Sequence, residues 1–275
     1  MKAILHSTVS SSVQILRRLL VVIALLAVLS LLGQYSALVL GHGRLLGFVP
    51  EFGLDYENNI PTYFAALLLL GAAFLAWVVN RVARTRRDQF ARHWAVLAGI
   101  LAYISVDEIA SLHERLILPI RHALDTDGIF YFAWVIPGIV LVILFVIAYA
   151  RFFWALSARW KRLFAAAGAI YVAGGLGMEF VGGAYASQYG GETLVYAMIS
   201  TVEEVLEMVG VAVLIYALLE YLRAHLSTIV VSLDAQPEDA RPVVQEPSSE
   251  GDGSLFSPPS GFEAATGRGA GTSEV

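Results

Sequence analysis

The sequence of 275 residues contains no cysteine and little charge. Without thiols the chain has no disulfides, no thiolate metal ligands and no thiol nucleophile, which excludes the redox and catalytic classes that depend on them. Charged residues make up 15% of the chain, against about 25% in soluble domains, whereas hydrophobic residues make up 57%. This composition predicts a protein embedded in a lipid bilayer.

Six apolar runs are long enough for a helix to cross a bilayer, which takes about 20 residues. They lie near residues 19–40, 61–82, 94–118, 130–155, 163–186 and 194–222. We therefore expect an all-α polytopic membrane protein with six transmembrane helices. The first run exceeds the apolar core of a signal peptide, about 7–15 residues, so we interpret it as a retained span. The expected organisation is an N-terminal segment 1–18, a membrane domain 19–225 and a tail 226–275.

Basic residues are scarce in alternate loops, and this asymmetry predicts the orientation. Thirteen of the sixteen lysines and arginines before Leu226 lie at the N-terminus, in the second and fourth loops and after the sixth run. Because basic residues resist translocation, these flanks are expected in the cytoplasm. Both termini are then cytoplasmic, as an even number of spans requires.

The tail after Leu226 differs in composition from the rest, with serine, proline, glycine, eight acids and two arginines. Such a segment buries too little apolar surface to fold, so we predict disorder and interpret it as a solubilising extension, with partner binding as the alternative. Subtracting the tail charge of −6 from the net charge of −5 leaves +1 for residues 1–225. The charge balance therefore gives no indication of nucleic-acid binding.

Acidic side chains interrupt three of the apolar runs, with Arg115 the only basic residue among these stretches. They are Asp107, Glu108 and Glu114 in the third run, Glu179 in the fifth, and Glu203, Glu204 and Glu207 in the sixth. A rise of about 1.5 Å per residue puts them in overlapping layers of the outer half of the membrane. If the helices are neighbours, seven crowded carboxyl groups form one site, which holds protons or binds cations.

Helical phase predicts that these acids point into the bundle, because positions three, four and seven apart share one face. In the third run this face carries Asp107, Ser111 and Glu114. In the sixth run it carries Tyr196, Ser200, Glu203, Glu207 and Gly210. Glu179 lies between Gly175 and Gly183, where small residues let another helix approach closely.

The first hypothesis is a metal-dependent enzyme acting on a lipid or another membrane-embedded substrate. Carboxylates with a histidine suit a divalent metal ion. We assign a catalytic role, as general base or orienting group, to Asp107, Ser111 and His113, the last also being a candidate ligand. The candidate metal ligands are Glu108, Glu114, Glu179, Glu203, Glu204 and Glu207. Asp55 and Glu57 are further candidates, in a loop expected just outside the membrane.

Other functions remain open. Intramembrane acids also mark proton and cation pathways, so a transporter or channel is the alternative, although no inverted repeat supports it. A structural or assembly role is the third hypothesis, but polar contacts in membranes contribute only about 0.6 kcal/mol on average, a weak reason for seven acids. A di-iron bundle is disfavoured because Ala110, not glutamate, precedes His113 by three residues.

Several motifs over residues 45–222 together resemble those of uncharacterised six-helix bacterial membrane proteins of the type found in cyanobacteria. These motifs are LDYENNIPTYFAALLLL, SVDEIASLHERL, AWVIPG, YVAGGLGMEFVGG and STVEEVLEMVG. The resemblance implies six spans in a bacterial inner membrane and the same acids, without a reaction. DYENN and VDEI are also loosely similar to alkaline ceramidases, which are zinc-dependent membrane hydrolases. Their His-x-x-x-His pair is replaced here by Glu203 and Glu207.

Overall fold

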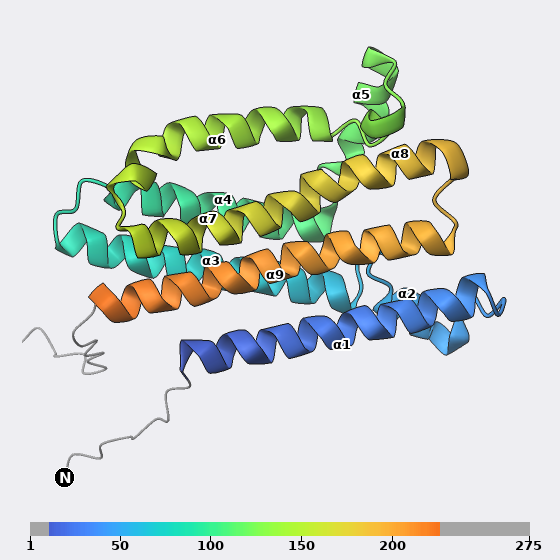
Figure 1. The fold of residues 1–275 in the computed structure, drawn as a ribbon, viewed down its shortest axis with the longest axis horizontal. Helices are drawn as coiled ribbons and strands as arrows, with labels where there is room; N and C mark the ends of the chain where they lie inside the picture. The colour runs from blue at the N-terminus through green and yellow to red at the C-terminus, as the bar shows by residue number, and fades with distance from the viewer. Residues whose placement is uncertain (1–10, 226–275) are drawn as a thin grey trace, which may run out of the picture. The chain divides into compact units, whose positions relative to one another are not determined.

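The computed structural model describes residues 11–225, all within the first of two compact units, Met1–Ile229, and every regular element among them is helical (Figure 1). The α-helices are α1 (Ser12–Leu38), α2 (Phe48–Phe52), α3 (Ile60–Thr85), α4 (Ala91–Ala110), α5 (Ile117–Leu124), α6 (Val135–Ala155), α7 (Ala158–Val172), α8 (Glu179–Tyr189) and α9 (Leu194–His225). Short 3-10 turns are η1 (Leu45–Gly47), η2 (Glu114–Leu116) and η3 (Gly128–Phe130), and the π-helix η4 (Ala173–Met178) joins α7 to α8. The predicted tail lies outside the described residues.

Six helices are long and apolar enough to cross a membrane, which confirms the all-α fold with six transmembrane helices. They are α1, α3, α4, α6, the continuous helix formed by α7, η4 and α8, and α9. The first begins at Ser12, earlier than the predicted run at residue 19. Ser11 explains the early start, because its hydroxyl accepts from the N–H of Gln14 at 3.2 Å and its own N–H donates to the Gln14 side chain at 2.9 Å.

Helix α9 lies at the centre of the described bundle. It packs against α1, against α3, and against α7 together with η4, while α3 forms a hairpin with α4. Helix α6 lies at the edge of the bundle and exposes most of its apolar side chains, as a helix facing lipid does (Figure 1). We call the end of the bundle near α5 and the start of α9 the α5 end, and the other the opposite end.

The third predicted span, residues 94–118, is wrong in its last third because α4 ends at Ala110. Ser111 adopts a left-handed conformation, with φ of +46°, and its N–H donates to the carbonyl of Asp107 at 2.7 Å. The Asp107 side chain accepts the N–H of His113 at 3.0 Å, so it replaces a helical bond at the turn. Asp107, Ser111 and Glu114 therefore do not form one stripe on a helix, as helical phase predicted. The fourth span also starts later than residue 130, at Val135.

Glycines let the α7–η4 segment approach α9 closely. A Cβ atom added at Gly210 would lie 2.7 Å from the backbone nitrogen of Tyr171, and one added at Gly174 would lie 2.9 Å from the carbonyl oxygen of Glu203. Contacts this short are possible only without a side chain, as in other membrane helix pairs built on small residues. The approach places η4 directly against the acidic part of α9.

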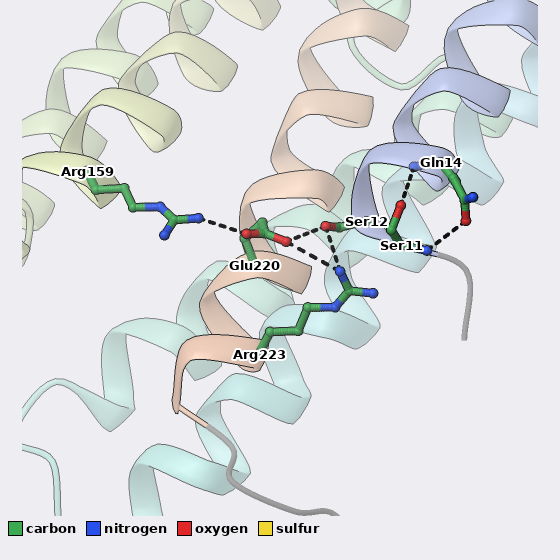
Figure 2. A network of polar contacts seen from close by, with 6 residues as sticks. All are labelled: Ser11, Ser12, Gln14, Arg159, Glu220 and Arg223. Carbon is green, nitrogen blue, oxygen red and sulfur yellow. Dashed lines mark hydrogen bonds and ion pairs between the residues drawn. The ribbon is translucent and has the colours of Figure 1, made fainter. Parts of the chain in front are cut away.

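The opposite end is held together by a polar network and by aromatic packing. Glu220 of α9 accepts from Ser12 of α1 and from Arg159 of α7, the latter at 2.7 Å, and Arg223 also donates to Ser12 at 3.0 Å (Figure 2). Next to it, the ring of Trp94 in α4 lies 5.0 Å from that of Tyr221, centroid to centroid. These contacts join four of the six spans at this end.

Candidate functional site

The structure brings acids from the loop 53–59, from α4 and η2, and from α8 and α9 into one electrostatically connected group near the α5 end. Glu204 interacts with Glu108 of α4, Glu203 with Glu179 of α8, and Glu108 with Glu57 of the loop. We call this group the acidic cluster, which comprises Asp55, Glu57, Asp107, Glu108, Glu114, Glu179, Glu203, Glu204, Glu207 and the imidazole of His113.

The helices that supply the cluster are not all in direct contact. Helix α8 packs on α9, whereas α4 packs mainly on α3, so the acids of α4 approach those of α9 through their side chains. Glu108, Glu179 and the three glutamates of α9 are half-buried. Among the described residues, the acid that forms ion pairs with arginine is Glu220 at the opposite end. The cluster therefore carries an excess of acid over base.

Asp107 and His113 form the best-defined pair in the cluster. The ring Nδ1 of His113 lies 2.8 Å from Oδ2 of Asp107, and the His113 ring lies 4.6 Å from that of Trp134, centroid to centroid. Burial lowers the pKa of His113, but the hydrogen bond and the charge of Asp107 outweigh it, so that the pKa is raised overall. In the neutral ring that donates Nδ1–H to Asp107, the lone pair lies on Nε2.

Trp134 connects His113 with Glu179. Its indole N–H donates to Oε1 of Glu179 at 2.6 Å, while its ring contacts that of His113. The indole comes from the residue just before α6, so it links the start of that helix to α8. Tryptophan is common at membrane interfaces, and no local pattern in the sequence indicates the partner that Trp134 finds in Glu179.

Glu207 lies deepest in the cluster, against the glycines of η4. A Cβ atom added at Gly175 would lie 2.6 Å from Oε1 of Glu207, so a larger residue there would displace this carboxyl group. The hydroxyl of Tyr171 donates to it, and Glu108 and His113 are among its electrostatic partners. Tyr171 was not predicted, although its position four residues before Gly175 on an expected helix is a usable signal. The π-helical turn is of a kind often found at functional sites.

The loop between α2 and α3 covers the cluster at the α5 end. Asn59 fixes it, donating to the carbonyls of Gly53 at 2.6 Å and Pro50 at 3.0 Å while capping α3. This places Asp55 within hydrogen-bonding reach of the Ser200 side chain in α9. Partial desolvation by the surrounding protein, followed by the neighbouring charge of Glu57, raises the pKa of Glu114, and partial desolvation raises that of Asp55, although both residues remain exposed at the surface.

Two candidates lie at the margin of the cluster. Glu114 is exposed in η2 and interacts electrostatically with Glu57 and His113. Ser111 caps α4 and is half-buried; within residues 11–225 its hydroxyl has no hydrogen bond to another side chain. The remaining predicted site residues interact with one another across helices that are far apart in the sequence.

The predicted metal ion is not matched by a ready-made ligand set. Within the part of the chain that the structure describes, no three histidine, aspartate or glutamate side chains converge closely enough to hold an ion. The side chains instead contact neighbours, as Asp107 does with His113, Glu179 with Trp134 and Glu207 with Tyr171. Metal binding would therefore require these carboxyl groups to turn toward one another.

The polar site extends only part of the way along the bundle. Beyond Glu207 the buried residues of α9 are apolar or glycine, among them Met208, Val211, Ala212 and Leu218. In this part of α3 the buried residues are alanines, Val79 and Asn80, whose side chain accepts from Arg84, and in α4 the buried residues end at Trp94. Within the described residues, the acidic cluster thus extends from the α5 end only as far as the middle of the helices.

A family model described as a domain of unknown function (DUF8692) matches residues 18–221. No curated protein and no solved structure matches the chain. The matched range contains the whole acidic cluster and all six spans except the first residues of α1 and the last of α9.

Proposed function

The chain belongs to the DUF8692 family, and we propose that it is a membrane protein whose acidic cluster binds a divalent cation in support of an enzymatic step on a lipid. The observation that carries this proposal is that nine carboxyl groups belong to one electrostatically connected group with a single histidine. Such an excess of acid in a low dielectric is stable only when cations or protons offset it. Without metal the same carboxyl groups hold protons.

The pair of Asp107 and His113 suits the chemical step. A carboxylate that accepts Nδ1–H fixes the ring and leaves Nε2 to accept a proton from water or to bind a metal ion. A metal ion, when bound, supplies Lewis-acid polarisation of the substrate and of water. Hydrolysis of a lipid is the reaction class to which these parts are best suited. It is also the reaction class of the alkaline ceramidases, from which the chain departs by having Glu203 and Glu207 in place of their zinc-binding His-x-x-x-His pair.

The acidic cluster lies at only one end of the bundle, which favours a binding site over a pathway across the whole membrane. A transporter needs polar groups or an alternating opening on both sides of the membrane. The described core between Glu207 and Tyr221 is instead apolar and aromatic, with Asn80 of α3 as a buried polar residue that is bonded to Arg84. Proton or cation transport is therefore the second candidate, and an assembly role the third.

We further propose that the protein lies in a bacterial inner membrane with both termini in the cytoplasm. The excess of lysine and arginine at the opposite end of the bundle supports this orientation. The acidic cluster then opens toward the outer side of the membrane.

The test is metal content by mass spectrometry on detergent-purified protein, for the parent and for a Glu203→Gln, Glu207→Gln variant. We expect stoichiometric metal in the parent and its loss in the variant. Metal addition should also release protons, which calorimetry in buffers of different ionisation enthalpy measures. A Glu51→Gln, Glu192→Gln variant is the matched control, since both residues are exposed. A folded parent that binds no metal would contradict the proposal, and ion flux into proteoliposomes would then favour transport.

A further inference from the structure

An apolar groove of about 530 Å³ lies between α6 and the helix formed by α7, η4 and α8. Ile139 and Val142 of α6 form one wall, and Ala169, Ala173 and Leu176 lie on the other. All nine lining residues are apolar or glycine. The volume is in the range of pockets that hold small ligands.

Both walls of the groove belong to membrane spans. Water is absent at this depth of a bilayer, so an apolar groove open to the membrane is filled by hydrocarbon. Along the second wall the helix rises roughly 15 Å from Ala169 to Glu179, which is half of a hydrocarbon core of about 30 Å. This is the depth that an acyl chain of one leaflet occupies. The groove thus matches one lipid chain in length as well as in polarity.

The groove borders the acidic cluster. Leu176 packs at Gly138, where an added Cβ atom would lie 3.0 Å from Cδ2 of Leu176 and 3.0 Å from Cζ3 of Trp134. Trp134 in turn donates to Glu179 and contacts His113. The π-helix η4 is a shared wall, since Ala173, Leu176 and Gly177 line the groove while Gly175 faces Glu207. A lipid chain in the groove would have its head at Glu179.

We propose that this groove holds an acyl chain of an amine-headed membrane lipid, whose ammonium group lies at Glu179 at the edge of the acidic cluster. The inference deepens the proposed function, on which it rests, by naming the substrate class. Charge complementarity selects the head, because an ammonium group is a cation that can offset the excess acid of the cluster, whereas a head that is only anionic cannot. The acyl chain itself gives no selectivity between lipids, because all bilayer chains are as apolar as the groove.

The test is photolabelling of the full chain in nanodiscs. The probes are phosphatidylethanolamine and phosphatidylglycerol that carry the same diazirine in one acyl chain, and adducts are mapped by peptide mass spectrometry. We expect adducts on residues 139–143 and 172–180, more with the amine head than with the anionic one. Ala173→Trp and Val142→Trp obstruct the groove from its two walls. Each should reduce these adducts by about tenfold, equivalent to about 1.4 kcal/mol.

The control is Leu141→Trp, which lies on α6 outside the groove, 65% exposed, and should leave the adducts unchanged. Two groove variants from different walls keep the test valid if one fails to fold. Equal adducts on the groove and on the outer face of α6, insensitive to both variants, would overturn the proposal in favour of unselective lipid contact. Equal labelling by the two lipids would contradict the proposed preference for an amine head group.

The same experiment distinguishes a failure of the proposed cation site from a failure of the proposed lipid site. The Glu203→Gln, Glu207→Gln variant tests cation binding and leaves the groove residues intact. Groove adducts that persist in a parent without metal would support the lipid site and contradict only the cation site. Metal binding without groove adducts would contradict only the lipid site.

Discussion

Asp107 has two roles at the scale of single residues. Its carboxylate accepts the backbone N–H of His113 and the ring Nδ1–H of the same residue, so it shapes the chain after α4 and fixes the imidazole. The sequence predicted both residues as members of the site. It did not predict their contact, because a continuous helix would have separated positions 107 and 113 by nearly two turns.

The raised pKa of His113 gives a test by pH. His113 binds its proton more tightly in the folded than in the unfolded protein, so its contribution to stability is complete below about pH 6.5 and is lost as the pH rises through the raised pKa. The raised pKa values of Asp55 and Glu114 act in the same direction, beginning above about pH 4. We expect the melting temperature in detergent to fall between about pH 6 and pH 8.

Asp107→Asn removes the charge that raises the pKa of His113, so the fall in melting temperature over this range should become shallower. Asp125→Asn is the control, because Asp125 is exposed beyond α5 and should keep the parent slope. Equal slopes for the parent and Asp107→Asn would show that His113 is not coupled to Asp107 in solution.

The sequence predicted the acids of the site but not the residues that donate hydrogen bonds to them. Acids in an apolar run are conspicuous, since each is costly in a membrane. Trp134 is ordinary near a membrane interface, where amphipathic rings are common, and Tyr171 is one aromatic residue within an apolar span. Their roles depend on which helices meet, which a single sequence does not contain.

At the scale of elements, the π-helix η4 sets the distance between the α7–α8 helix and α9. Gly174 faces the backbone of Glu203, whereas an added Cβ at Gly168 of α7 meets no atom within 4 Å. Gly174→Ala should therefore destabilise the protein by roughly 1–3 kcal/mol through overpacking. Gly168→Ala should be neutral or stabilise it by up to about 1 kcal/mol, because alanine favours a helix.

The measurement is the shift in melting temperature of the two glycine variants against the parent, in the same detergent. A fall for Gly174→Ala with no fall for Gly168→Ala is the expected pattern. Equal shifts for both variants would mean that η4 does not lie against α9 as described.

The boundaries of the elements were harder to predict than their existence. Apolar residues continue past Ser111, at Leu112, Leu116 and Ile117, so hydrophobicity alone extended the third span to residue 118. The helix ends at Ala110 because a side-chain bond within the turn replaces the helical one. Similarly, nothing in the hydrophobic pattern distinguishes the π-helical turn from the α-helix on either side.

At the scale of the whole molecule, the composition and the lengths of the runs sufficed to predict six spans, because a bilayer permits few alternatives to helices. The order of packing around α9 was not predictable, since lipid-facing and buried helices are similarly apolar here. Helix α6, at the edge of the bundle, is as hydrophobic as the central ones.

The absence of cysteine makes the orientation testable, because a single introduced cysteine is the only thiol. Asp127→Cys lies at the α5 end and Gln89→Cys at the opposite end, both at exposed positions. We expect a membrane-impermeant maleimide to label Asp127→Cys in intact cells, and Gln89→Cys only after permeabilisation. The reverse pattern would contradict cytoplasmic termini.

The π-helical turn also sets how the fifth span faces α9. Six residues of η4 lie between Val172 and Glu179, in a wider turn than an α-helix makes. Deleting one of them would let the span relax to a regular α-helix, and the five remaining residues would turn through about the same angle as the six π-helical ones. Glu179 would therefore keep its direction toward Trp134, while the widened backbone at the glycines facing α9 would be lost. A related chain one residue shorter here would keep the indole contact but change the room that is left for Glu207.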